Sequence, residues 1–137
     1  VATIKVPCTP DGLAACKALA DESIKVNVTL IFSVAQAILS AKAGAKYVSP
    51  FVGRLDDNSH NGVELIAQIS ALYNQQMIRT EVLAASLRDV PSVSKCFGVG
   101  ADIVTMPPAV FEKMYNHVLT DKGLDQFDKD YAASVKE

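Results

Sequence analysis

The strongest constraint in this sequence is a pattern of strand followed by helix that occurs five times with short connections. Runs rich in β-branched and apolar residues predict strands at 1–7, 24–32, 45–50, 81–86 and 102–106. Apolar residues at helical spacing follow each run. This alternation predicts a parallel sheet with crossover helices. The candidate folds are a doubly wound sheet and part of a (β/α)8 barrel, because a complete barrel takes about 250 residues and this chain has 137.

Capping residues mark where the predicted helices begin. Ser33 with Gln36, and Asn61 with Glu64, have the spacing of capping boxes. Gly44 is predicted to end the helix that begins at Ser33, because glycine commonly follows the last turn of a helix. The polar segment 53–60, with sequence GRLDDNSH, is predicted to be a loop. We expect residues 1–137 to form a single domain in which 120–137 is a C-terminal tail helix.

Composition narrows the class of protein. Half of the residues are hydrophobic, which excludes disorder, and the net charge of −2 argues against a nucleic-acid partner. No apolar run approaches the roughly 18 residues of a membrane helix, so we expect no membrane partner. Cys8, Cys16 and Cys96 form no paired motif, which favours a reducing, cytoplasmic setting. His60 and His117 lack the spacing of a metal site.

Lys5 is the most unusual polar residue in a predicted strand. Ligands of parallel α/β folds bind beyond the carboxyl ends of the strands, and Lys5 stands between Ile4 and Val6. If its side chain points inward, desolvation lowers its pKa, and a neutral amine can attack a carbonyl to form a Schiff base. The alternative is a lysine on an edge strand whose ammonium reaches solvent.

Two arginines follow predicted strands and suit an anion. Arg54 comes after the third strand, and Ser86 and Arg88 end the fourth. Guanidinium groups bind phosphate oxygens through paired hydrogen bonds, although solvated surface arginines remain the alternative. The neighbouring pair Asp56 and Asp57 is interpreted as part of a solvated loop rather than a metal or acid site.

Four ordered motifs connect these residues to a known family. The segments are KVPCTPDGLAACKAL, NVTLIFSVAQAILSAKAGAKYVSPFVGRLDD, VLAASLR and GADIVTMPP. Together they resemble the transaldolase family, including its short fructose-6-phosphate aldolase branch, over essentially the whole chain. The resemblance implies an α/β fold of the (β/α)8 TIM-barrel type, with this chain covering about the fourth to eighth β/α units and a C-terminal helix.

The resemblance also implies roles for eight residues. Lys5 corresponds to the family's Schiff-base lysine, and Asn27 and Thr29 to residues that hydrogen-bond the substrate and the catalytic water. Ser49 and Phe51 lie in the family's SPFVGR motif and belong to the substrate site. The implied phosphate ligands are Arg54, Ser86 and Arg88.

These roles imply a transaldolase of the pentose phosphate pathway. Such an enzyme transfers a dihydroxyacetone unit from fructose 6-phosphate or sedoheptulose 7-phosphate to an aldose phosphate, without metal or cofactor. Phe51, together with Asn27 and Ser49, argues against a fructose-6-phosphate aldolase, because that branch carries Tyr at this position. The acceptor sugar stays open, as does a sulfonate in place of the phosphate.

The short length of the chain leaves two competing hypotheses open, a catalytically incomplete half-barrel and a sugar-phosphate-binding module. The family's acid/base aspartate lies on a strand without a counterpart here. We therefore expect a natural N-terminal segment of roughly 80 residues, judged from barrel size. The family's short members form pentamers and decamers through the tail, so we also expect a homo-oligomer.

Overall fold

The computed structural model describes residues 1–136 and consists of parallel strands alternating with helices. The strands are β1 (Ile4–Pro7), β2 (Val26–Ile31), β3 (Tyr47–Pro50), β4 (Glu81–Ala84) and β5 (Ile103–Val104). The helices are α1 (Pro10–Asp21), α2 (Val34–Lys42), α3 (Val52–Asp57), α4 (Gly62–Gln75), α5 (Val90–Gly98), α6 (Pro108–Lys113) and α7 (Val118–Val135).

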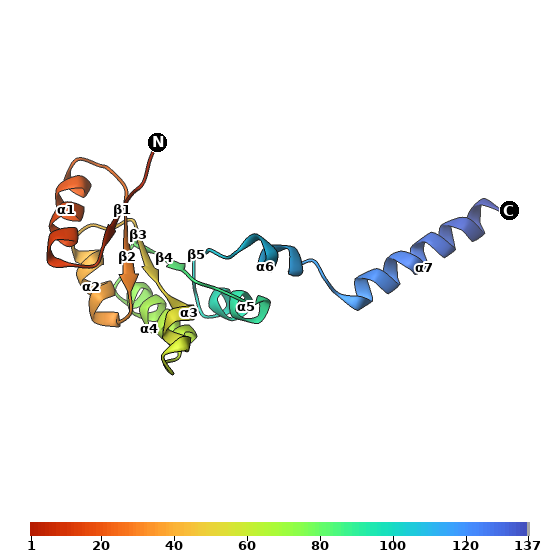
Figure 1. Ribbon diagram of the computed structural model, residues 1–137. Coiled ribbons are helices and arrows are strands. Elements are labelled where there is room, and N and C mark those ends of the chain that lie inside the picture. The colour runs from red at the N-terminus through yellow and green to blue at the C-terminus, as the bar shows by residue number, and fades with distance from the viewer. Residues whose placement is uncertain (137) are drawn as a thin grey trace.

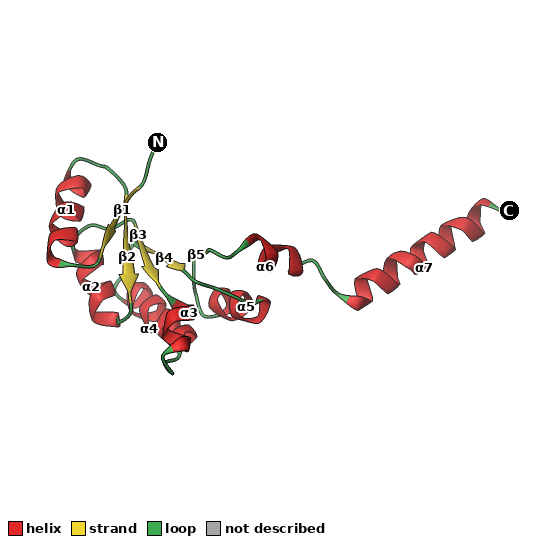
Figure 2. Ribbon diagram, viewed as in Figure 1, coloured by secondary structure: helices red, strands yellow, loops and turns green. Residues whose placement is uncertain are grey.

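The sheet keeps the order of the chain. Its strands are arranged β1-β2-β3-β4-β5, and every neighbouring pair is parallel. Crossovers of uniform hand between sequential neighbours place their helices on the same side of the sheet. Figure 1 and Figure 2 show α1, α2, α4 and α5 along one side of the strands. The fold is therefore the α/β type with a singly wound parallel sheet, as in a (β/α)8 barrel.

The hydrophobic core lies between the helices and the face of the sheet that they cover. Val28, Val48 and Val82 are buried from three neighbouring strands, and Ile66 and Ile69 are buried from α4. Fully burying a side chain of this size contributes about 1.5–3 kcal/mol. Burial of these side chains therefore stabilises the packing of the helices on the sheet.

The predicted helix starts are confirmed by their hydrogen bonds. Ser33 Oγ accepts from the Gln36 backbone N–H at 3.2 Å, and Asn61 Oδ1 accepts from that of Glu64 at 3.0 Å. The Gln36 side chain accepts from the backbone N–H of Phe32, at 2.8 Å, rather than from that of Ser33. Side-chain caps are also provided by Thr9 and Asp89.

Two expectations about secondary structure were wrong. The segment 53–60 begins as helix α3 rather than forming a loop throughout, because Val52 is buried and Leu55 packs against the core while the polar residues face solvent. The strands are also shorter than predicted. β1 begins only at Ile4, opposite Val26, and β5 is limited to the two residues paired with Leu83 and Ala84.

The C-terminal part of the chain extends away from the sheet (Figure 1). Helix α7 has no buried residue. Its apolar side chains are exposed, namely Val118, Leu119, Leu124, Phe127, Tyr131 and Val135. Among residues 1–136, none of the helices combines the length and apolar character needed to cross a membrane.

Candidate active site

A row of polar side chains lies on the sheet face opposite the core. Lys5 pairs with Asn27 across β1 and β2, and Asn27 pairs with Tyr47 across β2 and β3. Side chains alternate between faces, so Ser49 shares the face of Tyr47. Ser49 Oγ donates a hydrogen bond of 2.7 Å to Asn27 Oδ1. The structure therefore brings Lys5, Asn27 and Ser49 onto three adjacent strands of one face.

Thr29 adds a hydroxyl that the described residues leave unsatisfied. Its Oγ1 is buried and has no hydrogen-bond partner within residues 1–136. A buried polar group without a partner costs about 1–3 kcal/mol. A buried hydroxyl of this kind has hydrogen-bonding capacity that a water or a ligand can satisfy.

A bulge in β2 near Thr29 returns the end of the strand to the core. Between Val28 and Ile31 the β2 register gains one residue relative to β3, and Leu30 has a φ of 60°. An extra residue of this kind resets the alternation of side chains. Ile31 therefore returns to the buried side, where it is fully covered, while Leu30 is exposed.

The sequence left two orientations of Lys5 open, an inward, desolvated lysine and a lysine on an edge strand. In the structure its side chain is exposed, and within the described residues β1 pairs with β2. Its location opposite Asn27 nevertheless keeps the amine on the polar face.

A second cluster forms where α3 meets the end of β4. Ser86 and Arg88 line a cavity of about 140 Å³ together with Gly53. A Cβ at position 53 would lie 2.3 Å from the Ser86 carbonyl oxygen and 3.1 Å from Arg88 Nε. Only glycine permits this approach, which sets α3 directly against the residues that follow β4. Ser86 itself has a φ of 60°, a strained value for a residue with a side chain.

Arg88 has a partner that the sequence analysis did not identify. Its Nη1 lies 2.5 Å from Asp57 Oδ1, and both side chains are about half exposed. The hydrogen bond and the charge of Arg88 lower the pKa of Asp57, and the same contact raises the pKa of Arg88. The neighbouring Asp56 accepts a hydrogen bond from the Gly62 N–H. Within the described chain, no group of three or more His, Cys, Asp or Glu residues has the arrangement of a metal site.

Arg54 lies over an aromatic ring. Its Cζ is 4.8 Å from the centroid of the Phe51 ring. Phe51 follows β3 and forms an isolated bridge with Ala85, the residue before Ser86. Phe51 and Arg54 therefore stand next to the cluster of Ser86 and Arg88, although Arg54 does not line its cavity.

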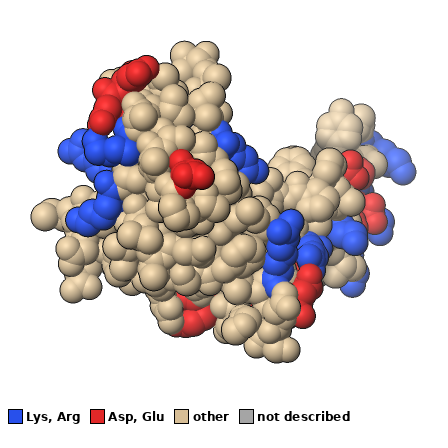
Figure 3. Space-filling view, turned by 60° about the vertical axis from the view of Figure 1, so that its left-hand side comes forward, with Lys and Arg blue, Asp and Glu red and all other residues tan. Residues whose placement is uncertain are grey.

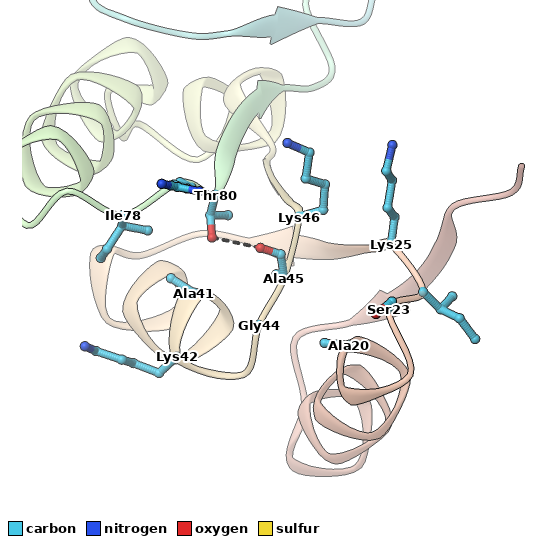
Figure 4. A pocket seen from close by; sticks show the side chains of 12 residues that line it. Ala20, Ser23, Lys25, Ala41, Lys42, Gly44, Ala45, Lys46, Ile78 and Thr80 are labelled. Atoms are coloured by element: carbon cyan, nitrogen blue, oxygen red, sulfur yellow. Dashed lines mark hydrogen bonds between the residues drawn. The ribbon is translucent and has the colours of Figure 1, made fainter.

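A further hollow lies at the opposite end of the strands and is lined by none of the candidate site residues. It measures about 550 Å³ and is lined by residues that precede β2, β3 and β4 (Figure 4). Lys25 and Lys46 point the same way from its rim in Figure 4, and Lys46 pairs with Glu81 at 2.9 Å. On the face shown in Figure 3, uncharged surface separates groups of Lys and Arg. In barrel folds this end of the strands serves stability rather than catalysis.

The fold and the polar strand ends define a barrel-type α/β protein, and comparisons with known proteins agree. GMP reductase from Trypanosoma brucei matches 75% of this chain and 24% of its own, with a TM-score of 0.59 and 19% identity. A mandelate oxidase matches 69% of this chain and 29% of its own, with a TM-score of 0.52 and 20% identity. At these identities the likeness concerns the fold alone.

Sequence comparison gives the family. A family model described as transaldolase/fructose-6-phosphate aldolase matches residues 2–137. A probable transaldolase of Paracoccus denitrificans is 58% identical over 130 residues, and one of Caulobacter vibrioides is 57% identical over 131. These matches cover 95% and 96% of this chain. The chain belongs to the transaldolase/fructose-6-phosphate aldolase family, and it spans about 60% of the length of these relatives.

Proposed function

We propose that the chain acts as a transaldolase that uses Lys5 to form a Schiff base with a ketose phosphate. The observation that carries the proposal is the row of Lys5, Asn27 and Ser49 on adjacent strands, with the unsatisfied Thr29 hydroxyl on the same strand as Asn27. The family match supports the same class of reaction. The proposed donors are fructose 6-phosphate and sedoheptulose 7-phosphate, in the pentose phosphate pathway.

The proposed chemistry is covalent catalysis. The neutral Lys5 amine attacks the ketose carbonyl, and loss of water gives a protonated imine. The imine accepts the electron pair when the C3–C4 bond breaks, the proton of the C4 hydroxyl passes to the catalytic water, and an aldose leaves. The retained three-carbon enamine attacks the aldehyde of an acceptor aldose, and hydrolysis then frees Lys5. Asn27 and Thr29 hydrogen-bond the substrate hydroxyls and the water in this scheme.

In this proposal the substrate phosphate is bound by the second cluster together with Arg54, which stands beside it. Arg54, Ser86 and Arg88 follow β3 and β4, at the carboxyl ends where barrel ligands bind. Two guanidinium groups and a hydroxyl match the acceptor oxygens of a phosphate. Phe51 supports transaldolase rather than aldolase, because its ring has no hydroxyl to activate a water.

The proposal extends to the assembly and its location. Helix α7 exposes Leu124, Phe127 and Tyr131 at helical spacing, which suits packing against another copy of the chain. We therefore propose a homo-oligomer, as a pentamer or decamer. The three cysteines are free, and burial raises the pKa of Cys96 to about 11. Free thiols are compatible with the reducing cytoplasm that we propose.

Borohydride trapping tests the proposed chemistry. The chain is incubated with fructose 6-phosphate, reduced, and analysed by intact mass and peptide mapping. We expect a three-carbon adduct on Lys5, and its loss in Lys5→Met. Lys25→Met is the matched control, because Lys25 is an exposed lysine at the start of the neighbouring strand. Absence of an adduct, or an adduct that survives in Lys5→Met, would refute the proposal.

A further inference from the structure

Arg54 is supported by a ring rather than by a carboxylate. Its guanidinium lies over Phe51, and Phe51 packs against Phe32 with ring centroids 5.8 Å apart and an angle of 55° between the rings. Within residues 1–136 no ion pair involves Arg54. We call Phe32 and Phe51 the aromatic platform. It is the contact that the structure provides for orienting this guanidinium.

The platform is anchored through the backbone at both of its residues. The Phe32 N–H donates to Gln36 Oε1, which belongs to the first turn of α2. The Phe51 N–H donates to the Ile31 carbonyl oxygen at 3.2 Å. The next residue, Val52, donates to the Ala85 carbonyl oxygen at 3.0 Å. The backbone positions that carry the two rings are therefore fixed relative to the ends of β2, β3 and β4.

Phe32 contributes little to the core, so packing alone does not account for its place. Its side chain is 36% exposed. It borders a hollow of about 210 Å³ that Leu55, His60 and Leu65 also line. A large aromatic side chain that stays partly exposed at the carboxyl end of a strand stands where ligands of this fold bind.

The two arginines proposed to bind the phosphate, Arg54 and Arg88, are held in different ways. Arg88 donates to Asp57, which uses one of its donors and offsets its charge. A ring beneath a guanidinium uses no donor and leaves the charge uncompensated, so the N–H edges of Arg54 stay free for an anion. This difference matters because Asp56 and Asp57 place negative charge on the same short helix.

We propose that Phe51, backed by Phe32, is a positioning residue that orients Arg54 toward the phosphate of the substrate. The platform thereby favours phosphorylated over unphosphorylated ketoses. This inference rests on the proposed function, because it assigns the phosphate to Arg54. Phe51 would then have two roles. Its ring face orients Arg54, and its lack of a hydroxyl keeps it from activating a water.

Titration of the isotope-labelled chain with fructose 6-phosphate and with fructose tests the platform, with backbone amide shifts as the readout. Cation–π contacts at exposed sites contribute about 0.5–1 kcal/mol, which corresponds to about a two- to five-fold change in Kd. We expect Phe51→Leu to weaken fructose 6-phosphate binding by that factor without changing fructose binding. Phe51→Tyr keeps the ring face and should retain the parent's ratio of fructose 6-phosphate affinity to fructose affinity. Phe97→Leu removes an exposed aromatic residue of α5 as a matched control.

A double-mutant cycle separates positioning from a general structural effect. If Phe51 acts through Arg54, adding Phe51→Leu to Arg54→Gln weakens binding no further. Equal weakening of both sugars by Phe51→Leu, or its full effect in the Arg54→Gln background, would overturn the inference. If Phe51→Leu does not fold, Phe32→Leu and Arg54→Lys provide the same test, because both positions are more exposed. Each of these variants should weaken the binding of fructose 6-phosphate and leave the binding of fructose unchanged.

The cycle also distinguishes the two proposals. If Arg54→Gln weakens fructose 6-phosphate binding but Phe51→Leu, Phe32→Leu and Arg54→Lys do not, the platform is wrong and the assigned phosphate site stands. If Arg54→Gln leaves fructose 6-phosphate binding unchanged, the assignment of the phosphate to Arg54 is wrong. The role proposed for the aromatic platform is then wrong as well.

Discussion

The two faces of the sheet differ in what their side chains do. On the covered face, Val28, Val48 and Val82 are fully buried against the helices. On the opposite face, Lys5 is exposed and Asn27 is half-buried in a hydrogen bond with Ser49. The same strands supply both sets because successive side chains alternate. Residues one position apart can therefore be selected separately for stability and for chemistry.

The largest expected effect tests the covered face. Ile66→Ala on α4 removes a fully buried side chain from the core. We expect the free energy of unfolding to fall by about 2–5 kcal/mol, because lost burial and the residual cavity both destabilise the fold. Urea denaturation measures this change. Leu39→Ala on α2, whose side chain is 56% exposed, is the control. Similar losses in both variants would contradict the assignment of the core.

A smaller effect tests a polar contact within the helical layer. The buried Tyr73 hydroxyl donates to the Ala37 carbonyl oxygen at 2.6 Å. Tyr73→Phe leaves that carbonyl without its partner, and we expect a loss of about 1–3 kcal/mol in the free energy of unfolding. Tyr115→Phe, at an exposed tyrosine, should change it little.

The same tyrosine makes stability depend on alkaline pH. Burial raises the pKa of Tyr73 above its ordinary value of 10.0. Its contribution is complete below pH 10, and it is lost as the pH rises further, because the unfolded state ionises first. We expect the urea midpoint to fall above pH 10 in the parent and to fall less in Tyr73→Phe. Equal slopes in the two proteins would show that Tyr73 is not the group responsible.

The smallest effect has the opposite sign and concerns the polar face. Thr29→Val replaces the unsatisfied hydroxyl by a methyl group of similar size. We expect the free energy of unfolding to rise by up to about 1 kcal/mol, since a buried group without a partner is removed. Borohydride trapping with fructose 6-phosphate should become slower in the same variant. Destabilisation would indicate that the hydroxyl is satisfied within the fold.

Much of the fold follows from local patterns that the sequence displays. The alternation of strands and helices predicted the parallel sheet, and capping residues such as Ser33 and Asn61 marked helix starts. Strand lengths were overestimated because a strand extends only as far as its partner. β5 has two residues since β4 offers it only Leu83 and Ala84.

Parts of the site depend on contacts between distant residues and were not predictable in this way. The pairing of Asp57 with Arg88 spans 31 positions and depends on helix α3. The polar residues of this segment predicted a loop instead of a helix. The bulge at Leu30 leaves no local signal, since leucine has no preference for a positive φ. Motif resemblance placed Lys5 and Asn27 on neighbouring strands, and the register shows them to be direct partners.

The sequential order of the strands has a consequence for folding. Within the described residues, β2 to β5 each pair with the strand that precedes them, so each of these pairings closes a loop of one β/α unit. Pairing between sequential neighbours gives a lower contact order than pairing between distant strands would. During synthesis, the preceding strand that each of β2 to β5 pairs with therefore leaves the ribosome before it does.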